Sequence, residues 1–218
     1  MSEMRTEEEQ VQALKDWWKE NGKSLVLGVA AALAIVFGWK AWQQNQQRNA
    51  ENASVLYQNL VDAVVNVVSG QGEVDVSLST ARHLGGQLKT DFEKEAYARY
   101  AAMLLARVAI EKGELDTALN ELDWVLAHEP DAAQAALAKM RKARILAAQD
   151  KVDEGLKLLD SLNSKQFEIQ VAELKGDLLL KKGDRDGARQ AYEVAARDGT
   201  DQRPILRMKL DDLAVEVK

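Results

Sequence analysis

The sequence contains no cysteine and only two prolines, Pro130 and Pro204. Without cysteine the chain can form no disulfide bond, so an exported domain must be stabilised by packing. The same absence excludes a cysteine nucleophile and cysteine metal ligands. Because proline interrupts helices, its scarcity, together with the lack of a long stretch of period two, favours an all-α chain.

The chain also has no basic stripe. It holds 29 lysines and arginines against 35 aspartates and glutamates, a net charge of −6. Residues 1–49 contain six of each sign, so the whole acidic excess lies further along the chain. An acidic domain without a basic stripe binds nucleic acid poorly, and we expect no nucleic acid among the partners.

Motifs for catalysis or cofactor binding are missing too. The two histidines, His83 and His128, have no His, Cys or Asp neighbour at the spacing of a metal site. There is no phosphate-binding glycine loop and no Gly-x-Ser-x-Gly elbow. The acidic segment 184–187 lacks the complete ligand pattern of a calcium loop and is better explained as a turn with a helix N-cap. We therefore expect no metal, no cofactor and no enzymatic activity.

The most apolar stretch is Ser24–Trp42, in which Lys40 is the only charged residue. A helix needs about 20 mostly apolar residues to cross a bilayer, and this stretch suffices if Lys40 reaches the headgroups. Tryptophans flank it at the positions of interfacial aromatics, namely Trp17, Trp18, Trp39 and Trp42. We predict that residues 24–42 form a single transmembrane signal-anchor helix. The alternative is a buried helix of a soluble core.

Basic residues predict the orientation of this span. Four precede it and two follow it in a comparable window: Arg5, Lys15, Lys19 and Lys23, then Lys40 and Arg48. The excess places the N-terminal segment, residues 1–23, in the cytoplasm and exports residues 43–218. Small residues within the span recur at every fourth position, at Ala30, Ala34 and Gly38, and predict a face against which another membrane helix packs.

The segment before the span is amphipathic. Thr6 and Glu9 fit a capping box, and Asn21-Gly22 is predicted to end the helix. The apolar side chains that share one face are Val11, Leu14, Trp17 and Trp18. We interpret this helix as lying along the cytoplasmic membrane surface; the alternative is a frayed tail.

Residues 43–52 are polar and good helix formers, so we interpret them as a juxtamembrane linker that continues the helix. Beyond the linker, residues 53–218 alternate between amphipathic segments and turn residues. Ser54 is a candidate N-cap of the first segment, and Gly85-Gly86 is a predicted break. The predicted helices are 53–69, 77–89, 91–111, 115–128, 131–149, 152–162, 166–181, 185–198 and 203–216.

These helices form repeating pairs. Segments 111–126, 149–162 and 181–195 align on Ala118, Gly155 and Ala188, at separations of 37 and 33 residues. This spacing is close to the roughly 34 residues of tetratricopeptide repeats. Small residues are expected where paired helices cross, at Ala106, Ala143 and Gly176 as well as the three aligned positions. Turn glycines are expected at Gly113 and Gly183, with Asp150 in that place in the middle unit. Residues 53–89 and 203–216 are the predicted caps of the stack.

Several segments resemble the YfgM family: Glu20-Asn21-Gly22-Lys23 and Gly38-Trp39-Lys40 at the ends of the span, Tyr57-Gln58-Asn59, and Leu174-Lys175-Gly176-Asp177 followed by Lys182-Gly183-Asp184. The resemblance covers essentially the whole chain. It implies a single-pass inner-membrane protein of Gram-negative bacteria with a periplasmic tetratricopeptide-like domain. It also implies association with the SecYEG translocon and with a membrane-anchored periplasmic chaperone of the parvulin-like PpiD type.

The class of function that remains is the binding of a protein partner. The first helix of each pair is expected to line a concave face, on which the outward positions are Tyr100, Met103, Arg107 and Ile110, then Leu137, Met140, Arg144 and Ala147. Methionine beside arginine suits apolar segments and carboxylates. We predict partner binding at Tyr100, Met103, Arg107, Ile110, Met140 and Arg144. The alternative is that the methionines are core and the arginines are merely solvated.

The leading interpretation is therefore a membrane-anchored adaptor or co-chaperone at the Sec translocon. It would bind a partner chaperone, or unfolded and nascent secreted chains, by this helical-repeat groove. The alternative is a structural scaffold of an inner-membrane complex for envelope assembly or division.

Overall fold

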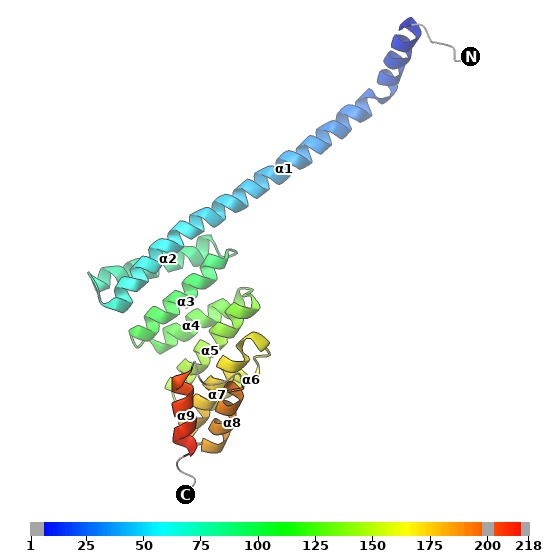
Figure 1. Ribbon diagram of the computed structural model, residues 1–218. Coiled ribbons are helices and arrows are strands. Elements are labelled where there is room, and N and C mark those ends of the chain that lie inside the picture. The colour runs from blue at the N-terminus through cyan, green and yellow to red at the C-terminus, as the bar shows by residue number, and fades with distance from the viewer. Residues whose placement is uncertain (1–6, 198–202, 215–218) are drawn as a thin grey trace. The chain divides into compact units, whose positions relative to one another are not determined.

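The computed structural model describes residues 7–197 and 203–214, and every regular element in this part of the chain is helical, as predicted (Figure 1). The chain divides into two compact units, residues 1–51 and residues 52–218, the second of which we call the repeat domain. The elements are α1 (Glu7–Ser69), α2 (Val74–Asp91), α3 (Ala96–Glu111), α4 (Leu115–Ala127), α5 (Ala132–Ala148), α6 (Val152–Asp160), the short 3-10 helix η1 (Lys165–Phe167), α7 (Glu168–Lys182), α8 (Arg185–Ala195) and α9 (Pro204–Ala214).

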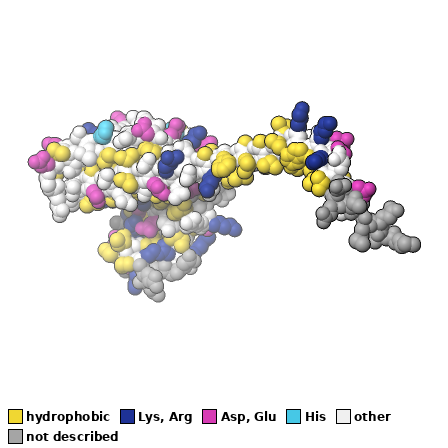
Figure 2. Space-filling view, turned by 90° about the horizontal axis from the view of Figure 1, so that it is seen from above, with side chains coloured by type: hydrophobic (Ala, Val, Ile, Leu, Met, Phe, Trp, Pro, Cys, Tyr) yellow, Lys and Arg dark blue, Asp and Glu magenta, His cyan; other side chains and the backbone are white. Residues whose placement is uncertain are grey.

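The first unit is formed by the N-terminal part of α1. This helix is the one element in the described residues that is long and apolar enough to cross a membrane. None of its most apolar window is buried inside the protein, whereas a core helix of a soluble domain would be mostly buried. Figure 2 shows the apolar side chains as a yellow band along this part of the helix. They include Leu25, Val26, Leu27, Val29, Leu33, Ile35, Val36, Phe37 and Trp39.

The prediction that Asn21-Gly22 ends the first helix is wrong, because α1 continues through both residues. The Asn21 side chain donates to the carbonyl of Trp17, 3.1 Å away and one turn back in the same helix. A Cβ at Gly22 would lie 3.2 Å from ring atoms of Trp18, so the missing side chain leaves room for the indole. Ser54 likewise lies inside α1 and is no N-cap. Thr6, the other half of the predicted capping box, lies outside the described residues.

The repeat domain consists of stacked helix pairs, and the predicted repeat is confirmed. The pairs are α3 with α4, α5 with α6, and α7 with α8, each packed closely together. The turns within the pairs use the left-handed backbone region, at Gly113 with φ 75° and at Gly183 with φ 89°. Asp150 takes the same region in the middle pair, with φ 62°. Aspartate tolerates this conformation better than most residues, so the middle turn survives without glycine.

Small residues lie where the paired helices cross, as the alignment predicts. A Cβ at Gly155 would lie 2.9 Å from the carbonyl oxygen of Ala143 and 2.9 Å from Cδ2 of Leu178. A Cβ at Gly176 would lie 2.3 Å from Cε1 of Tyr192. The aligned alanines are fully buried, namely Ala106, Ala118, Ala143 and Ala188. Close approach of the two backbones therefore requires these residue types.

The α2–α3 region differs from the prediction. Gly85-Gly86 does not break a helix, because α2 runs on to Asp91. A Cβ at Gly85 would lie 2.6 Å from Cδ1 of Leu105, so this glycine permits close packing of α2 on α3. The break comes later, and α3 begins only at Ala96, inside the predicted helix 91–111.

Side-chain caps fix two other helix starts. Asp131 accepts from the backbone N–H of Gln134, whose side chain in turn accepts from the backbone N–H of Asp131, and this capping box starts α5. Asp184 accepts from the N–H of Gly187 at 2.9 Å and starts α8. The acidic segment 184–187 is thus a turn and N-cap, as predicted.

The two ends of the stack are closed by the predicted caps. At one end Leu60 and Val64 of α1 share a buried cluster with Leu88 of α2 and Val108 of α3. At the other end Leu206 and Leu213 of α9 pack with Tyr192, Ala188 and Ala195 of α8. The apolar faces of the terminal pairs are therefore covered within the chain.

A polar network holds the second cap. The hydroxyl of Tyr192 donates to Oδ1 of Asp177 at 2.7 Å, and Nζ of Lys209 lies 2.6 Å from the same oxygen and 3.0 Å from Oε1 of Glu173. Burial and then the neighbouring Asp177 raise the pKa of Tyr192 well above its usual range. This network links α7, α8 and α9, because Lys209 belongs to α9 and Tyr192 to α8.

Candidate partner-binding surface

The predicted binding positions on α3 and α5 divide into exposed and buried residues. Tyr100, Arg107, Ile110 and Arg144 are exposed, and so is Leu137. We call the side of α3 and α5 that carries these residues, together with the groove beside α1 described below, the inner-helix surface.

The expectation that the two methionines face outward is wrong. Met103 is only 6% exposed and Met140 only 4% exposed. Met103 packs in the cluster that contains Ala118 and Leu122 of α4. Met140 packs in the next cluster along the stack, with Leu159 of α6. They fill the core between helix pairs, and they cannot provide an adaptable surface for a partner.

The residues that follow the two methionines, Leu104 and Arg141, were not predicted to belong to this surface. Leu104 and Arg141 are also 37 residues apart, and both are half-buried rather than fully buried. A helical face that contains Tyr100 and Arg107 can pass through either position 103 or position 104, because both lie about one turn from each. The apolar character of methionine favoured the wrong one.

Three arginines gather on this surface. Nη1 of Arg141 donates to the carbonyl of Met103 at 3.3 Å, which ties α5 to α3. Burial lowers the pKa of Arg141, and the positive charges of the neighbouring Arg107 and Arg144 lower it further. Within residues 7–197 and 203–214 none of the three forms an ion pair with a carboxylate. The surface therefore carries a local excess of positive charge in an acidic domain.

An apolar groove lies next to Arg107. It runs between the last turns of α1 and helix α3 and has a volume of about 400 Å³. Its lining residues are Val61, Val64, Val65, Val68, Ser69, Leu104 and Arg107. Val65 is 55% exposed, so the groove presents branched apolar side chains to solvent.

Tyrosines of both helices pack together one to two helical turns before the groove. The ring of Tyr57 on α1 lies 5.4 Å from that of Tyr97 and 6.2 Å from that of Tyr100 on α3, centroid to centroid. Burial and then the nearby Tyr100 and Tyr97 raise the pKa of Tyr57. The groove could not be predicted from the sequence, which indicates only a cap for this part of α1.

Comparisons with known proteins decide the family. A family model described as a tetratricopeptide repeat-like domain matches residues 15–215. The ancillary SecYEG translocon subunit of Escherichia coli (strain K12) is 33% identical over 96% of this chain and 97% of its own length. This chain belongs to the YfgM family. The proteins of the same name from Haemophilus influenzae and Aggregatibacter actinomycetemcomitans are 28% and 26% identical over 95% of this chain. No solved structure matches the chain.

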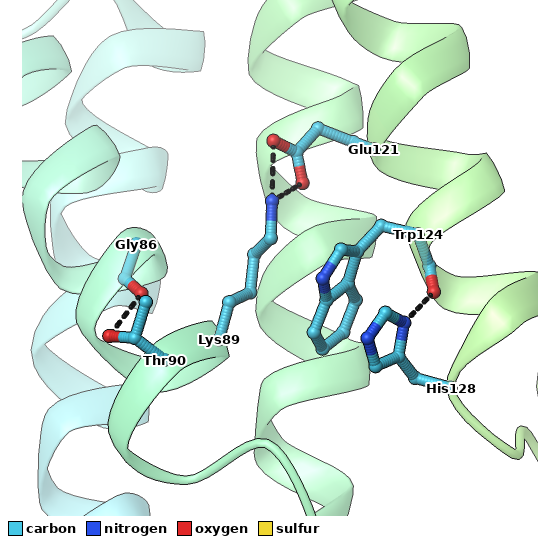
Figure 3. Close-up of polar contacts among 6 residues, drawn as sticks. All are labelled: Gly86, Lys89, Thr90, Glu121, Trp124 and His128. Atoms are coloured by element: carbon cyan, nitrogen blue, oxygen red, sulfur yellow. Dashed lines mark hydrogen bonds and ion pairs between the residues drawn. The ribbon is translucent and has the colours of Figure 1, made fainter.

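A second polar cluster in this YfgM-family chain joins α2 to α4 (Figure 3). Nζ of Lys89 lies 2.7 Å from Oε2 of Glu121 and 5.3 Å from the ring centroid of Trp124. The Trp124 and His128 rings stack at 3.8 Å. Nδ1 of His128 donates to the carbonyl of Trp124 at 2.6 Å, and Nε2 lies 3.1 Å from Glu93.

This cluster has a structural role. His128 stands at the end of α4, as predicted, and each of its ring nitrogens faces an oxygen acceptor. The contacts of the cluster hold α2 and the turn after it against α4, the second helix of the first pair. Across the described residues there is no group of three or more His, Asp or Glu side chains placed to hold a metal ion. The inner-helix surface is therefore the best candidate for function.

Proposed function

We propose that this chain is a membrane-anchored adaptor that associates with the Sec translocon and holds protein segments on its repeat domain. The observation that carries this proposal is the full-length similarity to ancillary SecYEG translocon subunits, which covers 95–97% of both chains in each comparison. The candidate span before the repeats supplies the membrane attachment that such a role requires.

The orientation that we propose follows the charge bias around the span. Residues 1–23 lie in the cytoplasm, residues 24–42 cross the inner membrane, and the repeat domain lies in the periplasm. The basic residues Lys15, Lys19 and Lys23 support this orientation, because positive charge is retained on the cytoplasmic side.

The mechanism that we propose is reversible binding without catalysis. The segments held belong to a partner chaperone, of the PpiD-like type that the family resemblance implies, or to secreted chains that emerge from the translocon. Exposed Tyr100, Ile110 and Leu137 offer apolar area, and Arg107 and Arg144 pair with carboxylates or carbonyls. Because both arginines are exposed, each is available without unfolding the domain.

The test is charge reversal at Arg107 and Arg144 in the full chain, with a photocrosslinker placed at Leu137. We expect Arg107→Glu with Arg144→Glu to reduce crosslinks to chaperone or nascent chains about tenfold, because attraction becomes repulsion. The control pair, Arg189→Glu with Arg207→Glu, makes the same charge change on α8 and α9 and should leave the crosslinks unchanged.

Co-isolation with SecYEG from detergent-solubilised membranes tests the translocon assignment separately. Recovery of SecYEG with the wild-type chain supports it, and its absence contradicts it. Crosslinks to nascent secreted chains favour the adaptor, whereas crosslinks only to mature envelope proteins would favour the alternative scaffold. Unchanged crosslinks in the Arg107 and Arg144 variant would show that this surface is not the binding site.

A further inference from the structure

The inner-helix surface changes character from one helix to the next. On α1 it consists of valines, on α3 of Leu104 followed by Arg107, and on α5 of Arg141 followed by Arg144. Leu104 and Arg107 are equivalent to Arg141 and Arg144 at the 37-residue offset of the repeat. Arg107 belongs both to the apolar groove, which it lines, and to the group of three arginines, because its charge acts on Arg141. An apolar groove thus continues directly into a cationic cluster.

The cluster contrasts with other basic residues of the repeat domain that have carboxylate partners. Arg82 pairs with Glu114 at 2.6 Å, and Lys182 pairs with Asp153 at 2.7 Å. In the described part of the chain no such partner accompanies the guanidinium groups of Arg107, Arg141 and Arg144, although the domain is acidic overall. Mutual repulsion among three cations is relieved when an anion binds among them.

The chemistry of the two parts selects the ligand. Guanidinium groups present planar pairs of N–H donors that match a carboxylate, and Arg141 is held in place by the carbonyl of Met103. The groove, at about 400 Å³ and lined mainly by valine and leucine, accepts branched apolar side chains. A phospholipid headgroup would use the cations but leave this groove without a role.

We propose that the inner-helix surface binds a peptide segment in which a carboxylate stands beside branched apolar residues. The apolar side chains enter the groove between α1 and α3, and the carboxylate lies among Arg107, Arg141 and Arg144. This inference rests on the proposed function, which assigns protein-segment binding to this surface, and it specifies the class of segment that is held.

The test uses the purified full chain in detergent micelles and two fluorescein-labelled synthetic peptides. One carries a single glutamate flanked by valine and leucine, and the other carries glutamine in its place. Fluorescence anisotropy at low salt should show about tenfold tighter binding of the glutamate peptide, the effect of one charge-assisted pair. Arg107→Gln with Arg144→Gln should remove this preference, and Arg189→Gln with Arg207→Gln should retain it.

Val65 tests the apolar part with a matched control. Val65 lines the groove and is 55% exposed, whereas Val76 on α2 is 57% exposed and lies outside the groove lining. Val65→Glu should weaken binding of the glutamate peptide at least about tenfold, since the bound peptide would bury the new carboxylate against its apolar side chains and near its own negative charge. Val76→Glu should leave binding unchanged. Both changes are at exposed positions, so a folded protein is expected in each case, and circular dichroism checks this.

Three results would overturn the inference. The first is equal affinity for the glutamate and glutamine peptides. The second is peptide binding that the arginine and Val65 variants do not change. The third is a loss of binding to phosphatidylglycerol vesicles in the arginine variant without any peptide preference, which would assign the cations to the membrane. In each case continued co-isolation of the chain with SecYEG would leave the proposed function standing, and only the ligand class would be wrong.

Discussion

Replacing Gly176 with alanine should lower the free energy of unfolding of the repeat domain by about 2 kcal/mol. The new Cβ would lie 2.3 Å from Cε1 and 2.4 Å from Cδ1 of Tyr192. That ring is fully buried, and its hydroxyl donates to Asp177, so it cannot rotate away without breaking the hydrogen bond. The steric overlap destabilises the fold by about 3 kcal/mol, which outweighs the stabilisation of about 1 kcal/mol from replacing a helical glycine.

Gly86 supplies the matched control for this prediction. It also lies inside a helix, α2, but a Cβ added there would meet nothing within 4 Å. Gly86→Ala should therefore stabilise the domain by about 0.5–1 kcal/mol. Urea denaturation of the full chain in micelles, followed by far-UV circular dichroism, measures both. Equal stability of the Gly176 variant and the wild type would show that α7 and α8 do not cross as closely as described.

Truncating Leu122 to alanine should lower the free energy of unfolding of the repeat domain further than the Gly176 change, by about 3 kcal/mol. Leu122 lies in the middle of α4, is fully buried, and shares a cluster with Met103 of α3 and Ile145 of α5. Removing its branch leaves a cavity between two successive helix pairs that the stacked helices cannot fill by moving together. The loss should appear as a lower urea midpoint with an unchanged dependence on urea concentration.

The same truncation at Leu180 is the control. Leu180 lies on α7 and is 38% exposed, so Leu180→Ala should change the free energy of unfolding by less than about 1 kcal/mol. A Leu122 variant as stable as the Leu180 variant would contradict the assignment of Leu122 to the core between α3, α4 and α5.

The pairing of helices could be predicted from sequence because it depends on steric requirements that only a few residue types meet. Gly176 faces a tyrosine ring, and Gly155 faces the backbone of Ala143, so each position requires the small side chain that the alignment detected. Asp150 adopts the same left-handed backbone conformation as Gly113 and Gly183. The 37-residue offset from Gly113 predicted this turn although the position is not a glycine.

Helix ends were harder to predict, because the same residue can end a helix or allow close packing within one. Asn21-Gly22 and Gly85-Gly86 both look like stops, yet Gly22 makes room for Trp18 and Gly85 makes room for Leu105. The neighbour that occupies the space of the missing side chain decides between the two outcomes. For Gly85 that neighbour lies on another helix and cannot be identified from local sequence.

The exposed positions of the candidate surface were predicted in part. The periodicity located Arg107 and Arg144 on an exposed face, but it put Met103 and Met140 there too, since positions 103 and 104 are nearly equivalent on a helix. The place of Arg141 on this surface was not predicted, because it depends on the packing of α5 against α3. The groove beside Val65 depends on the position of α1 against α3, which no single-helix pattern reveals.

We propose above all that one apolar helix tethers the repeat domain to the outer face of the cytoplasmic membrane. The absence of cysteine makes this directly measurable, because a single introduced cysteine can be labelled without background. Lys112→Cys places a thiol on the exposed turn after α3, and Gln12→Cys places one in the segment before the span. In spheroplasts of the native host a membrane-impermeant maleimide should label the cysteine at position 112 and reach position 12 only after lysis. Labelling of position 12 in intact spheroplasts, with position 112 protected until lysis, would contradict the account.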